Sequence, residues 1–347
     1  MERVRVPVAV GLLAAAGAAA IFVWTRRRRA RAYWEAPWTA AGRVERLCVY
    51  PVKSCKGILT DWLDCELRGV RSGERVDREF LLVDEAHGNA LVSARQCPRL
   101  VLVEAEVADG RLALRFPTGR RVFVDLAEVE RRRDVRPAIL HEHTRTDGLD
   151  CGDEAAAAFA DFLQVGARRR LRLLRFAVGL FTERDARASP AAWQNAVPAG
   201  FQDHITFNDD AAFMLMTTRS VDALNARLAA DGEEPVSVDF FRPVIAVADA
   251  PPHDEDRWLE VRVGGAEFAC YRACSRCVLT TVDPTSGRLR ADGQPLKALR
   301  GYRLAPAGRL RDFYGRSPLF GVYAGLRRAG RVRVGDEVFV RYKPSPF

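Results

Sequence analysis

The chain has 347 residues, 48% of them apolar and 29% charged, which is an ordinary balance for a folded protein and leaves room for two domains. Its formal net charge is +9, but residues 1–35 hold seven arginines against two glutamates, so five of these nine charges lie at the N-terminus. The remaining excess of four is too small for a groove that follows a phosphate backbone, and without a nucleic-acid-binding motif it excludes that class of protein.

Residues 6–24 form a run of nineteen residues without a charge. As a helix this run would be roughly 28 Å long, enough to cross the hydrocarbon core of a bilayer. Five arginines at 26–31 follow it and, by the positive-inside rule, keep the body of the chain in the cytosol. A cleaved signal peptide is the alternative, because Ala-x-Ala patterns occur around 14–20. We therefore expect residues 1–35 to be a membrane anchor with a basic flank. Such a short anchor suits the mitochondrial outer membrane, with the peroxisomal membrane as the alternative.

The eight cysteines show no regular spacing of the kind found in secreted disulfide scaffolds. They are Cys48, Cys55, Cys65, Cys97, Cys151, Cys270, Cys274 and Cys277. This usage indicates a reducing compartment.

Short runs of β-forming residues dominate the chain from residue 43 onward. Strands are expected at 44–50, 80–83, 91–94, 100–107 and 112–116. Gly88-Asn89 and Asp109-Gly110 lie between neighbouring runs and predict tight hairpin turns. A helix is expected at 155–163, because apolar residues recur there at helical spacing behind Asp153, an N-cap candidate.

The stretch 182–202 is irregular and contains Pro190 and Pro198, so we place the junction of the two domains there. The predicted domains are 43–182 and 183–345. The arginine runs at 131–133 and 168–170 are interpreted as solvated charges of loops or edges.

After the junction, a second helix is expected at 221–228, with Thr218 or a nearby hydroxyl as its N-cap and Gly232 at its end. Further strands are expected at 213–216, 244–247, 259–263 and 332–340, with Gly264-Gly265 as a two-residue turn. No βαβ alternation and no glycine-rich phosphate loop occur, which argues against a Rossmann or P-loop enzyme. The pattern predicts a β-rich α+β chain with two β-barrel-like domains behind an N-terminal transmembrane helix.

Candidate chemistry is concentrated at Cys274-Ser275-Arg276-Cys277, where two thiols and a guanidinium precede an apolar run. A neighbouring guanidinium favours the thiolate, and a thiolate is a ligand for soft metals. The CxxC spacing alone leaves three alternatives open: buried structural cysteines, a redox-active thiol pair and half of a zinc site. A thioredoxin-type pair would need a βαβ setting, and a closed zinc site would need two more ligands. The one close histidine pair, His141 and His143, lies far upstream in a polar stretch and is interpreted as surface.

The segment from Cys274 to Pro284 resembles the signature of the MOSC family, in particular its mitochondrial amidoxime-reducing components. The block Tyr50-Pro51-Val52-Lys53-Ser54-Cys55-Lys56-Gly57 is similar to the opening of the family's N-terminal β-barrel domain. Residues 69–78 and 317–321 resemble two further blocks of the family. The resemblance covers 44–341, nearly the whole body, and is much more specific than CxxC.

The resemblance implies a molybdenum cofactor, Mo-molybdopterin, whose metal has the catalytic Cys277 as its single protein ligand. The positions that match cofactor contacts are Lys53, Ser54, Arg78, Asp209, Asp210, Ala211, Arg242, Ser275, Arg276 and Tyr323. Basic and hydroxyl groups suit the phosphate of the pterin, because they form charge-assisted hydrogen bonds with it. One departure concerns Asp210 and Ala211, which stand where family members have hydroxyl residues. A carboxylate there would repel an anionic cofactor unless it is protonated or turned away.

The implied reaction is the reduction of N-hydroxylated compounds such as amidoximes and hydroxylamines, with nitrite as a further candidate. Because the chain has no ferredoxin-type cysteine cluster, electrons would come from a separate carrier. The resemblance implies that this carrier is cytochrome b5 with NADH-cytochrome b5 reductase. Asp209, Asp210 and water are the candidate proton donors. Two alternatives remain open: a non-catalytic carrier of the cofactor, and a thiol oxidoreductase that uses Cys274 and Cys277.

Overall fold

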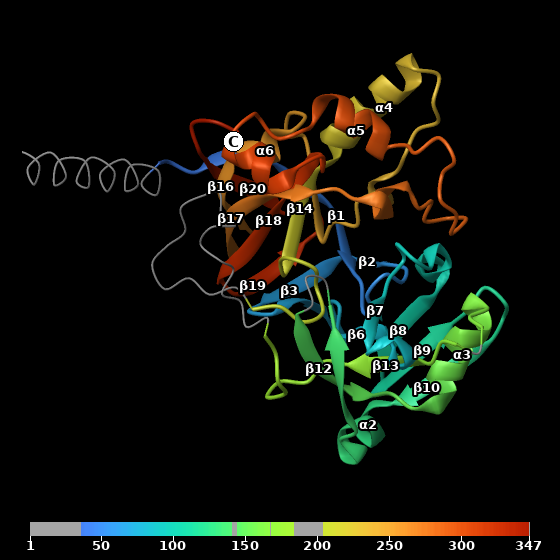
Figure 1. The fold of residues 1–347 in the computed structure, drawn as a ribbon. Coiled ribbons are helices and arrows are strands. Elements are labelled where there is room, and N and C mark those ends of the chain that lie inside the picture. The colour runs from blue at the N-terminus through green and yellow to red at the C-terminus, as the bar shows by residue number, and fades with distance from the viewer. Residues whose placement is uncertain (1–35, 141–143, 167, 184–203, 347) are drawn as a thin grey trace, which may run out of the picture.

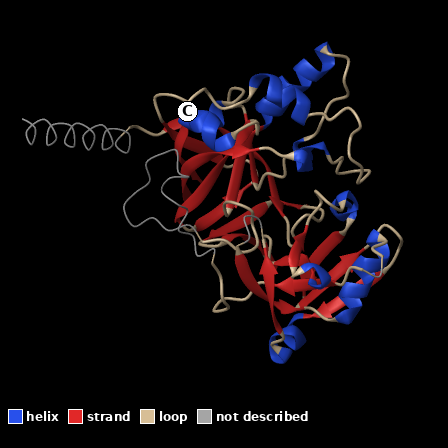
Figure 2. Ribbon diagram, in the orientation of Figure 1, coloured by secondary structure: helices blue, strands red, loops and turns tan. Residues whose placement is uncertain are grey.

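The computed structural model describes residues 36–140, 144–166, 168–183 and 204–346. The predicted anchor at 6–24, the pair His141 and His143, and nearly all of the predicted junction at 182–202 lie outside these residues. Within the described part, no helix is long and apolar enough to cross a membrane. Strands make up most of the regular structure, and the helices lie around them (Figure 2).

Five strands from the first half of the chain form a closed barrel. Their order is β11 (Val135–Ile139), β12 (Arg145–Asp150), β13 (Leu171–Arg175), β6 (Phe80–Asp84) and β7 (Ala90–Val92). A parallel pairing of Ala90 with Ile139 closes the ring between β7 and β11. The short 3-10 helix η1 (Glu85–His87) joins β6 to β7 and ends at Gly88. The φ of Gly88 is 68°, a left-handed conformation that glycine adopts readily because it has no Cβ. Since β6 and β7 pair antiparallel, the predicted hairpin is confirmed.

A three-stranded sheet and one helix share a core with this first barrel. The strands are β8 (Glu104–Ala108), β9 (Arg111–Arg115) and β10 (Arg121–Asp125). Asp109 and Gly110 have φ values of 52° and 68°, as the tight turn of the predicted hairpin requires. Helix α3 (Asp153–Leu163) packs onto the sheet, where the rings of Phe116 and Phe159 lie 5.2 Å apart. Its N-cap is Gly152, one residue before the predicted Asp153.

Seven strands close the second barrel. Their order is β15 (Ile245–Ala248), β14 (Phe213–Thr217), β18 (Leu319–Arg328), β17 (Ala266–Ser275), β16 (Trp258–Val263), β20 (Glu337–Tyr342) and β1 (Thr39–Val49). β1 pairs with both β20 and β15, which completes the ring, and β2 (Ile58–Thr60) adds to β1. The predicted turn at Gly264-Gly265 joins β16 to β17. A Cβ on Gly264 would lie only 2.4 Å from the carbonyl oxygen of Arg331, so a larger residue would not fit.

A four-stranded sheet lies between the two barrels (Figure 1). Its order is β19 (Gly330–Arg333), β3 (Trp62–Glu66), β4 (Gly69–Ser72) and β5 (Arg75–Val76). β3 and β19 come from opposite ends of the chain. β1 and β3, which the sequence grouped with residues 43–182, thus pair with strands of the later half: β1 with β15 and β20, and β3 with β19. The burial alternation of a strand predicts its faces but does not select its partner.

Some local structure differs from the sequence prediction. The 3-10 helix η2 (Pro98–Leu102) replaces the start of the strand expected at 100–107, because Pro98 has no N–H for a sheet and suits the first turn of a helix. Arg131 and Arg132 lie at the end of helix α2 (Leu126–Arg132) rather than in a loop, next to the carbonyl end of its dipole.

The second predicted helix is confirmed as α4 (Thr218–Ala230), and the hydroxyl of Thr217 caps it by accepting the N–H of Ser220. Helices α5 (Leu296–Tyr302) and α6 (Arg309–Tyr314) were not predicted. They are too short to show a clear helical period in the sequence.

Candidate active site

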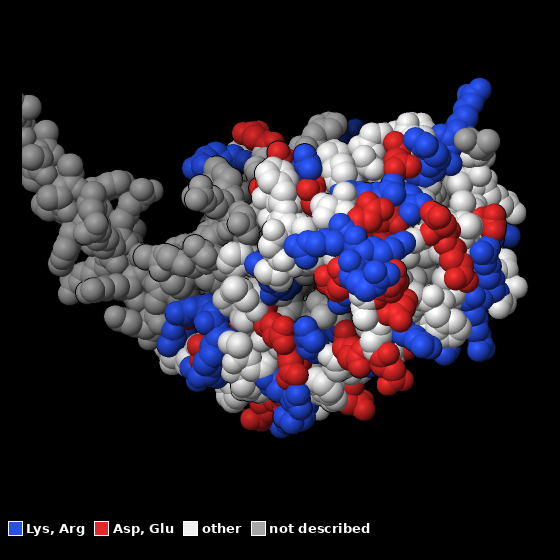
Figure 3. All heavy atoms as spheres, turned by 90° about the horizontal axis from the view of Figure 1, so that it is seen from below, with Lys and Arg blue, Asp and Glu red and all other residues white. Residues whose placement is uncertain are grey.

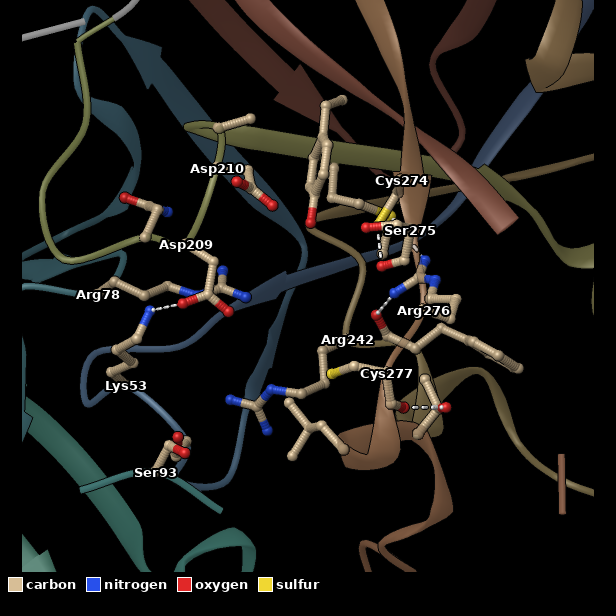
Figure 4. A pocket seen from close by; sticks show the side chains of 18 of the residues that line it. Lys53, Arg78, Ser93, Asp209, Asp210, Arg242, Cys274, Ser275, Arg276 and Cys277 are labelled. Carbon is tan, nitrogen blue, oxygen red and sulfur yellow. Dashed lines mark hydrogen bonds and ion pairs between the residues drawn. The ribbon is translucent and has the colours of Figure 1, made fainter. Parts of the chain in front are cut away.

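Segments from both barrels meet around a cleft that is partly open to solvent and has an empty volume of about 870 Å³. We call it the Cys277 cleft. It is lined by all the residues predicted for the site: Lys53, Ser54, Arg78, Asp209, Asp210, Ala211, Arg242, Ser275, Arg276, Cys277 and Tyr323. Figure 4 shows the labelled side chains around this common space. The fold thus brings together positions that are far apart in the sequence.

Cys277 lies where β17 has ended and the short 3-10 helix η6 (Val278–Thr281) begins. Thr280 donates to the carbonyl oxygen of Cys277 through its backbone N–H at 3.0 Å and its hydroxyl at 2.7 Å, which holds the backbone in place. The side chain of Cys277 lines the cleft and is only partly buried. Its thiol is therefore accessible to a ligand.

Cys274 is in a different environment, although it belongs to the same CxxC motif. It is 2% exposed, and its thiol is hydrogen-bonded to the hydroxyl of Tyr323. Burial raises the pKa of the Cys274 thiol, so the group stays protonated at neutral pH. In the described residues, no group of three or more His, Cys, Asp or Glu side chains is placed to hold a metal ion.

Arg276 is buried, lines the cleft and is fixed by hydrogen bonds to the backbone around it. Its guanidinium donates to the carbonyl oxygens of Phe320 at 2.7 Å and Phe241 at 2.9 Å. Because these donors are used by the backbone, Arg276 contributes positive charge to the cleft more than free hydrogen-bond donors.

Arg78 and Arg242 form another part of the wall. Arg78 is paired with the adjacent Asp77 at 2.6 Å. Arg242 donates to the carbonyl oxygen of Cys55 at 2.7 Å, and no carboxylate among the described residues pairs with it. Burial, together with the charge of Arg78, lowers the pKa of the Arg242 guanidinium. A partly buried cation without a carboxylate partner is costly, so this part of the cleft favours an anionic ligand.

Three residues that line the cleft have a left-handed backbone conformation, which is unfavourable for residues other than glycine. The φ values are 70° at Ser54, 50° at Arg78 and 55° at Arg242. Each such conformation costs about 1–3 kcal/mol and tends to occur at functional sites. The surrounding structure therefore holds three side chains of the cleft in positions that local preference would not select.

Lys53 and Asp209 are joined by an ion pair of 2.5 Å between Nζ and Oδ1. The other carboxylate oxygen, Oδ2, accepts from Nη2 of Arg95 at 3.0 Å, and Nε of Arg95 lies 3.3 Å from Sγ of Cys277. Arg95 and Ser93, which also line the cleft, were not predicted from the sequence. One sequence feature could have pointed to them: Ser93, Arg95 and Gln96 follow directly on the apolar residues 91–92. Polar residues at the end of a strand often begin a loop that carries function.

Asp210 carries the carboxylate that stands where family members have a hydroxyl residue. Its Oδ1 atom lies 2.6 Å from Nη2 of Arg272, which stacks over the ring of Tyr323 at 5.3 Å. A nearby guanidinium therefore compensates the charge of this carboxylate. This ion pair removes most of the repulsion expected toward an anionic ligand.

The Cys277 cleft as a whole is basic. It is lined by Lys53, Arg78, Arg95, Arg242 and Arg276, against the two carboxylates of Asp209 and Asp210. On the outer face seen in Figure 3, by contrast, basic side chains are interspersed with acidic ones. The cleft thus favours an anionic ligand.

Comparisons with known proteins show the family of the chain. The family model described as the MOSC N-terminal beta barrel domain matches residues 41–166, and the model of the MOSC domain matches residues 202–339. Mitochondrial amidoxime-reducing component 1 of Xenopus laevis is 34% identical over 98% of this chain and 93% of its own length. Component 2 of Homo sapiens is 34% identical, with coverages of 91% and 86%. Component 1 of Homo sapiens is 33% identical, with coverages of 96% and 91%. The chain therefore belongs to the MOSC-domain family, in the group of the mitochondrial amidoxime-reducing components.

Proposed function

We propose that the chain is a molybdenum cofactor-dependent reductase of N-hydroxylated compounds, with Cys277 as the protein ligand of the metal. Membership of the family relates its function to the molybdenum cofactor. The observation that carries the proposal is the pairing of two features in one cleft. Cys277 offers an accessible thiol, and Arg242 offers a partly buried guanidinium without a carboxylate partner among the described residues.

The residues of the cleft fit the two parts of this cofactor. A thiolate is a soft ligand that suits molybdenum, and Cys277 is the cysteine of the cleft whose side chain is not fully buried. The phosphate of the pterin suits Arg78, Arg242 and the hydroxyl of Ser54, because cationic and hydroxyl donors form strong hydrogen bonds with phosphate oxygens.

When bound, the molybdenum cofactor supplies the two electrons that reduce the N–O bond of an amidoxime or hydroxylamine, with release of water. The protein orients the substrate and allows protons to reach it. Asp209 accepts from two cations and Asp210 is paired with Arg272, so both carboxylates act as hydrogen-bond acceptors. Water in the open cleft is therefore the favoured proton source.

The electron donor in this proposal is cytochrome b5 with its NADH-dependent reductase. Residues 6–24 would anchor the chain in the mitochondrial outer membrane, so that the body meets these partners in the cytosol. The relatives named above are described as mitochondrial components, which supports this location. Deleting residues 1–35 should release the chain from the membrane fraction of mitochondria after alkaline extraction. Retention of the shortened chain would contradict the anchor.

The reductase activity is tested with the purified full-length chain loaded with cofactor. We expect benzamidoxime to be converted to benzamidine when NADH, cytochrome b5 reductase and cytochrome b5 are supplied. Elemental analysis should give about one molybdenum per chain and no stoichiometric zinc. Cys277→Ala serves as the inactive control.

Two results would overturn parts of this proposal. If the loaded chain forms no benzamidine but passes its cofactor to a cofactor-free molybdenum enzyme, it is a carrier and not a reductase. If it contains stoichiometric zinc and no molybdenum, the assignment of Cys277 as a molybdenum ligand is wrong.

A further inference from the structure

Behind the Cys277 cleft, the ring of Tyr50 is covered by two arginines. The guanidinium carbon of Arg78 lies 4.3 Å from the ring centroid, and that of Arg242 lies 4.2 Å from it. Both arginines line the cleft, whereas Tyr50 is 2% exposed and does not. Arg78 follows β5, and Arg242 precedes β15 of the second barrel. One buried ring thus contacts two cations from distant parts of the fold.

Tyr50 is held in place independently of these stacking contacts. Its backbone N–H donates to Oδ1 of Asp77 at 2.9 Å, and its hydroxyl donates to the carbonyl oxygen of Pro243 at 3.2 Å. Gly57 packs closely against the ring, since a Cβ there would lie 2.4 Å from Cε1 of Tyr50. The ring is therefore a fixed surface, and the arginines adapt to it.

The two arginines carry like charges, which would otherwise drive them apart. Asp77 balances Arg78, but no carboxylate of the described residues pairs with Arg242. The π-face of an aromatic ring attracts a guanidinium, so stacking on Tyr50 offsets the repulsion without using the N–H donors of either arginine. The left-handed backbone at both arginines shows that their positions are imposed by the surroundings.

We propose that Tyr50 is a positioning residue that sets the spacing of Arg78 and Arg242, so that the two guanidiniums bind one phosphate group together. The inference rests on the proposed function, in which this phosphate belongs to the bound cofactor. Tyr50 itself touches neither phosphate nor cofactor. Its aromatic ring is the part that matters, and its hydroxyl serves only to orient the ring.

The first experiment measures the affinity of the cofactor-free full-length chain for inorganic phosphate by isothermal titration calorimetry. Tyr50→Phe keeps the ring and should bind within about twofold of the wild type, whereas Tyr50→Leu removes the ring and should bind about tenfold more weakly. Tyr302→Leu is the matched control, because Arg227 stacks on Tyr302 at 4.1 Å and neither residue lines the cleft. It should bind phosphate like the wild type. Equal binding by Tyr50→Leu and the wild type would overturn the proposal.

A second measurement uses the wild-type chain and covers the case in which Tyr50→Leu does not fold. The Nε–Hε resonances of Arg78 and Arg242 are identified in the NMR spectrum with Arg78→Lys and Arg242→Lys. Because both groups stack on one ring, both resonances should be displaced by its ring current, and both should move with one midpoint as phosphate is added. Movement of only one of them would show that the pair is not a common site.

The molybdenum content of the same protein preparations separates this inference from the proposed function. Full molybdenum in the wild type together with no effect of Tyr50→Leu on phosphate affinity overturns the role of Tyr50 alone. A wild type that binds neither phosphate nor molybdenum overturns both.

Discussion

Nε of Arg95 lies 3.3 Å from Sγ of Cys277, and the same guanidinium pairs with Asp209 at 3.0 Å. Arg95 follows β7 of the first barrel, whereas Cys277 and Asp209 belong to the second half of the chain. The surroundings of the proposed metal ligand are therefore complete only when the two barrels are assembled. A guanidinium at this distance stabilises negative charge on the sulfur and limits the directions in which it can point.

Replacing Arg95 by Gln should lower the molybdenum content or kcat about tenfold, because groups that orient a metal ligand have effects of this size. Arg95→Lys keeps the positive charge but cannot donate to Cys277 and Asp209 from two separate nitrogens. We expect its molybdenum content and kcat to lie between those of Arg95→Gln and the wild type. Elemental analysis and the electron paramagnetic resonance spectrum of the reduced protein measure the effect. Arg169→Gln is the matched control, because Arg169 contacts Cys97 at 3.8 Å outside the cleft. A spectrum and activity of Arg95→Gln equal to those of Arg169→Gln would contradict this role.

The two cysteines of the CxxC motif should respond differently to substitution by serine. Cys277→Ser should lose both molybdenum and amidoxime reduction, because a hydroxyl is a poor ligand for a soft metal. Cys274→Ser should keep activity within about threefold, since a serine hydroxyl can still take the hydrogen bond of Tyr323 and the side chain is buried. The assay is benzamidine formation per molybdenum. Equal loss in both variants would instead favour a dithiol mechanism.

The ion pair of Asp210 and Arg272 should be visible in a double-mutant cycle of the free energy of unfolding. Asp210→Ser leaves the largely buried Arg272 without its carboxylate and should cost about 1–2 kcal/mol, a value reduced by the partial exposure of Asp210. Adding Arg272→Met should recover part of this loss. Urea unfolding followed by fluorescence provides the four free energies. Strictly additive losses would mean that the pair contributes nothing.

Glu255 should make stability depend on pH. Its carboxyl is fully buried beside the hydroxyls of Thr217 and Ser220, and burial, reinforced by Asp256, raises its pKa from 4.5 to about 7. The folded chain thus holds this proton more tightly than the unfolded chain. The resulting stabilisation is complete below pH 4.5 and is lost as the pH rises through about 7.

Glu255→Gln removes this titration, so the melting temperature of the variant relative to the wild type should rise between pH 5 and pH 8, by an amount equivalent to about 1–3 kcal/mol. The nearby His253, whose pKa is lowered by burial to about 4, acts in the opposite direction. It is present in both proteins and cancels in the difference. A difference in melting temperature that does not change with pH would exclude Glu255 as the titrating group.

Local patterns in the sequence were enough for much of the secondary structure. The turns at Gly88 and at Asp109-Gly110, helix α4 and most strands follow from residues close together in the chain, where backbone preference and burial alternation act. Helices α5 and α6 and the 3-10 helix η2 were missed because segments of five to seven residues carry little periodic signal. The partners of β1 were also beyond local reasoning, since strand pairing depends on contacts between distant segments.

The sequence by itself marked many residues of the candidate site, among them Lys53, Arg78, Arg242 and Cys277, but not Arg95 or Ser93. Only the tertiary structure decided how these residues differ. It buries Cys274 and leaves Cys277 accessible, and it brings Arg95 to Cys277 across 182 residues of chain. The physical reason is that burial and charge pairing are properties of the assembled surfaces. A motif specifies side-chain chemistry, but the packing of two barrels decides which thiol meets solvent and which cation lies beside it.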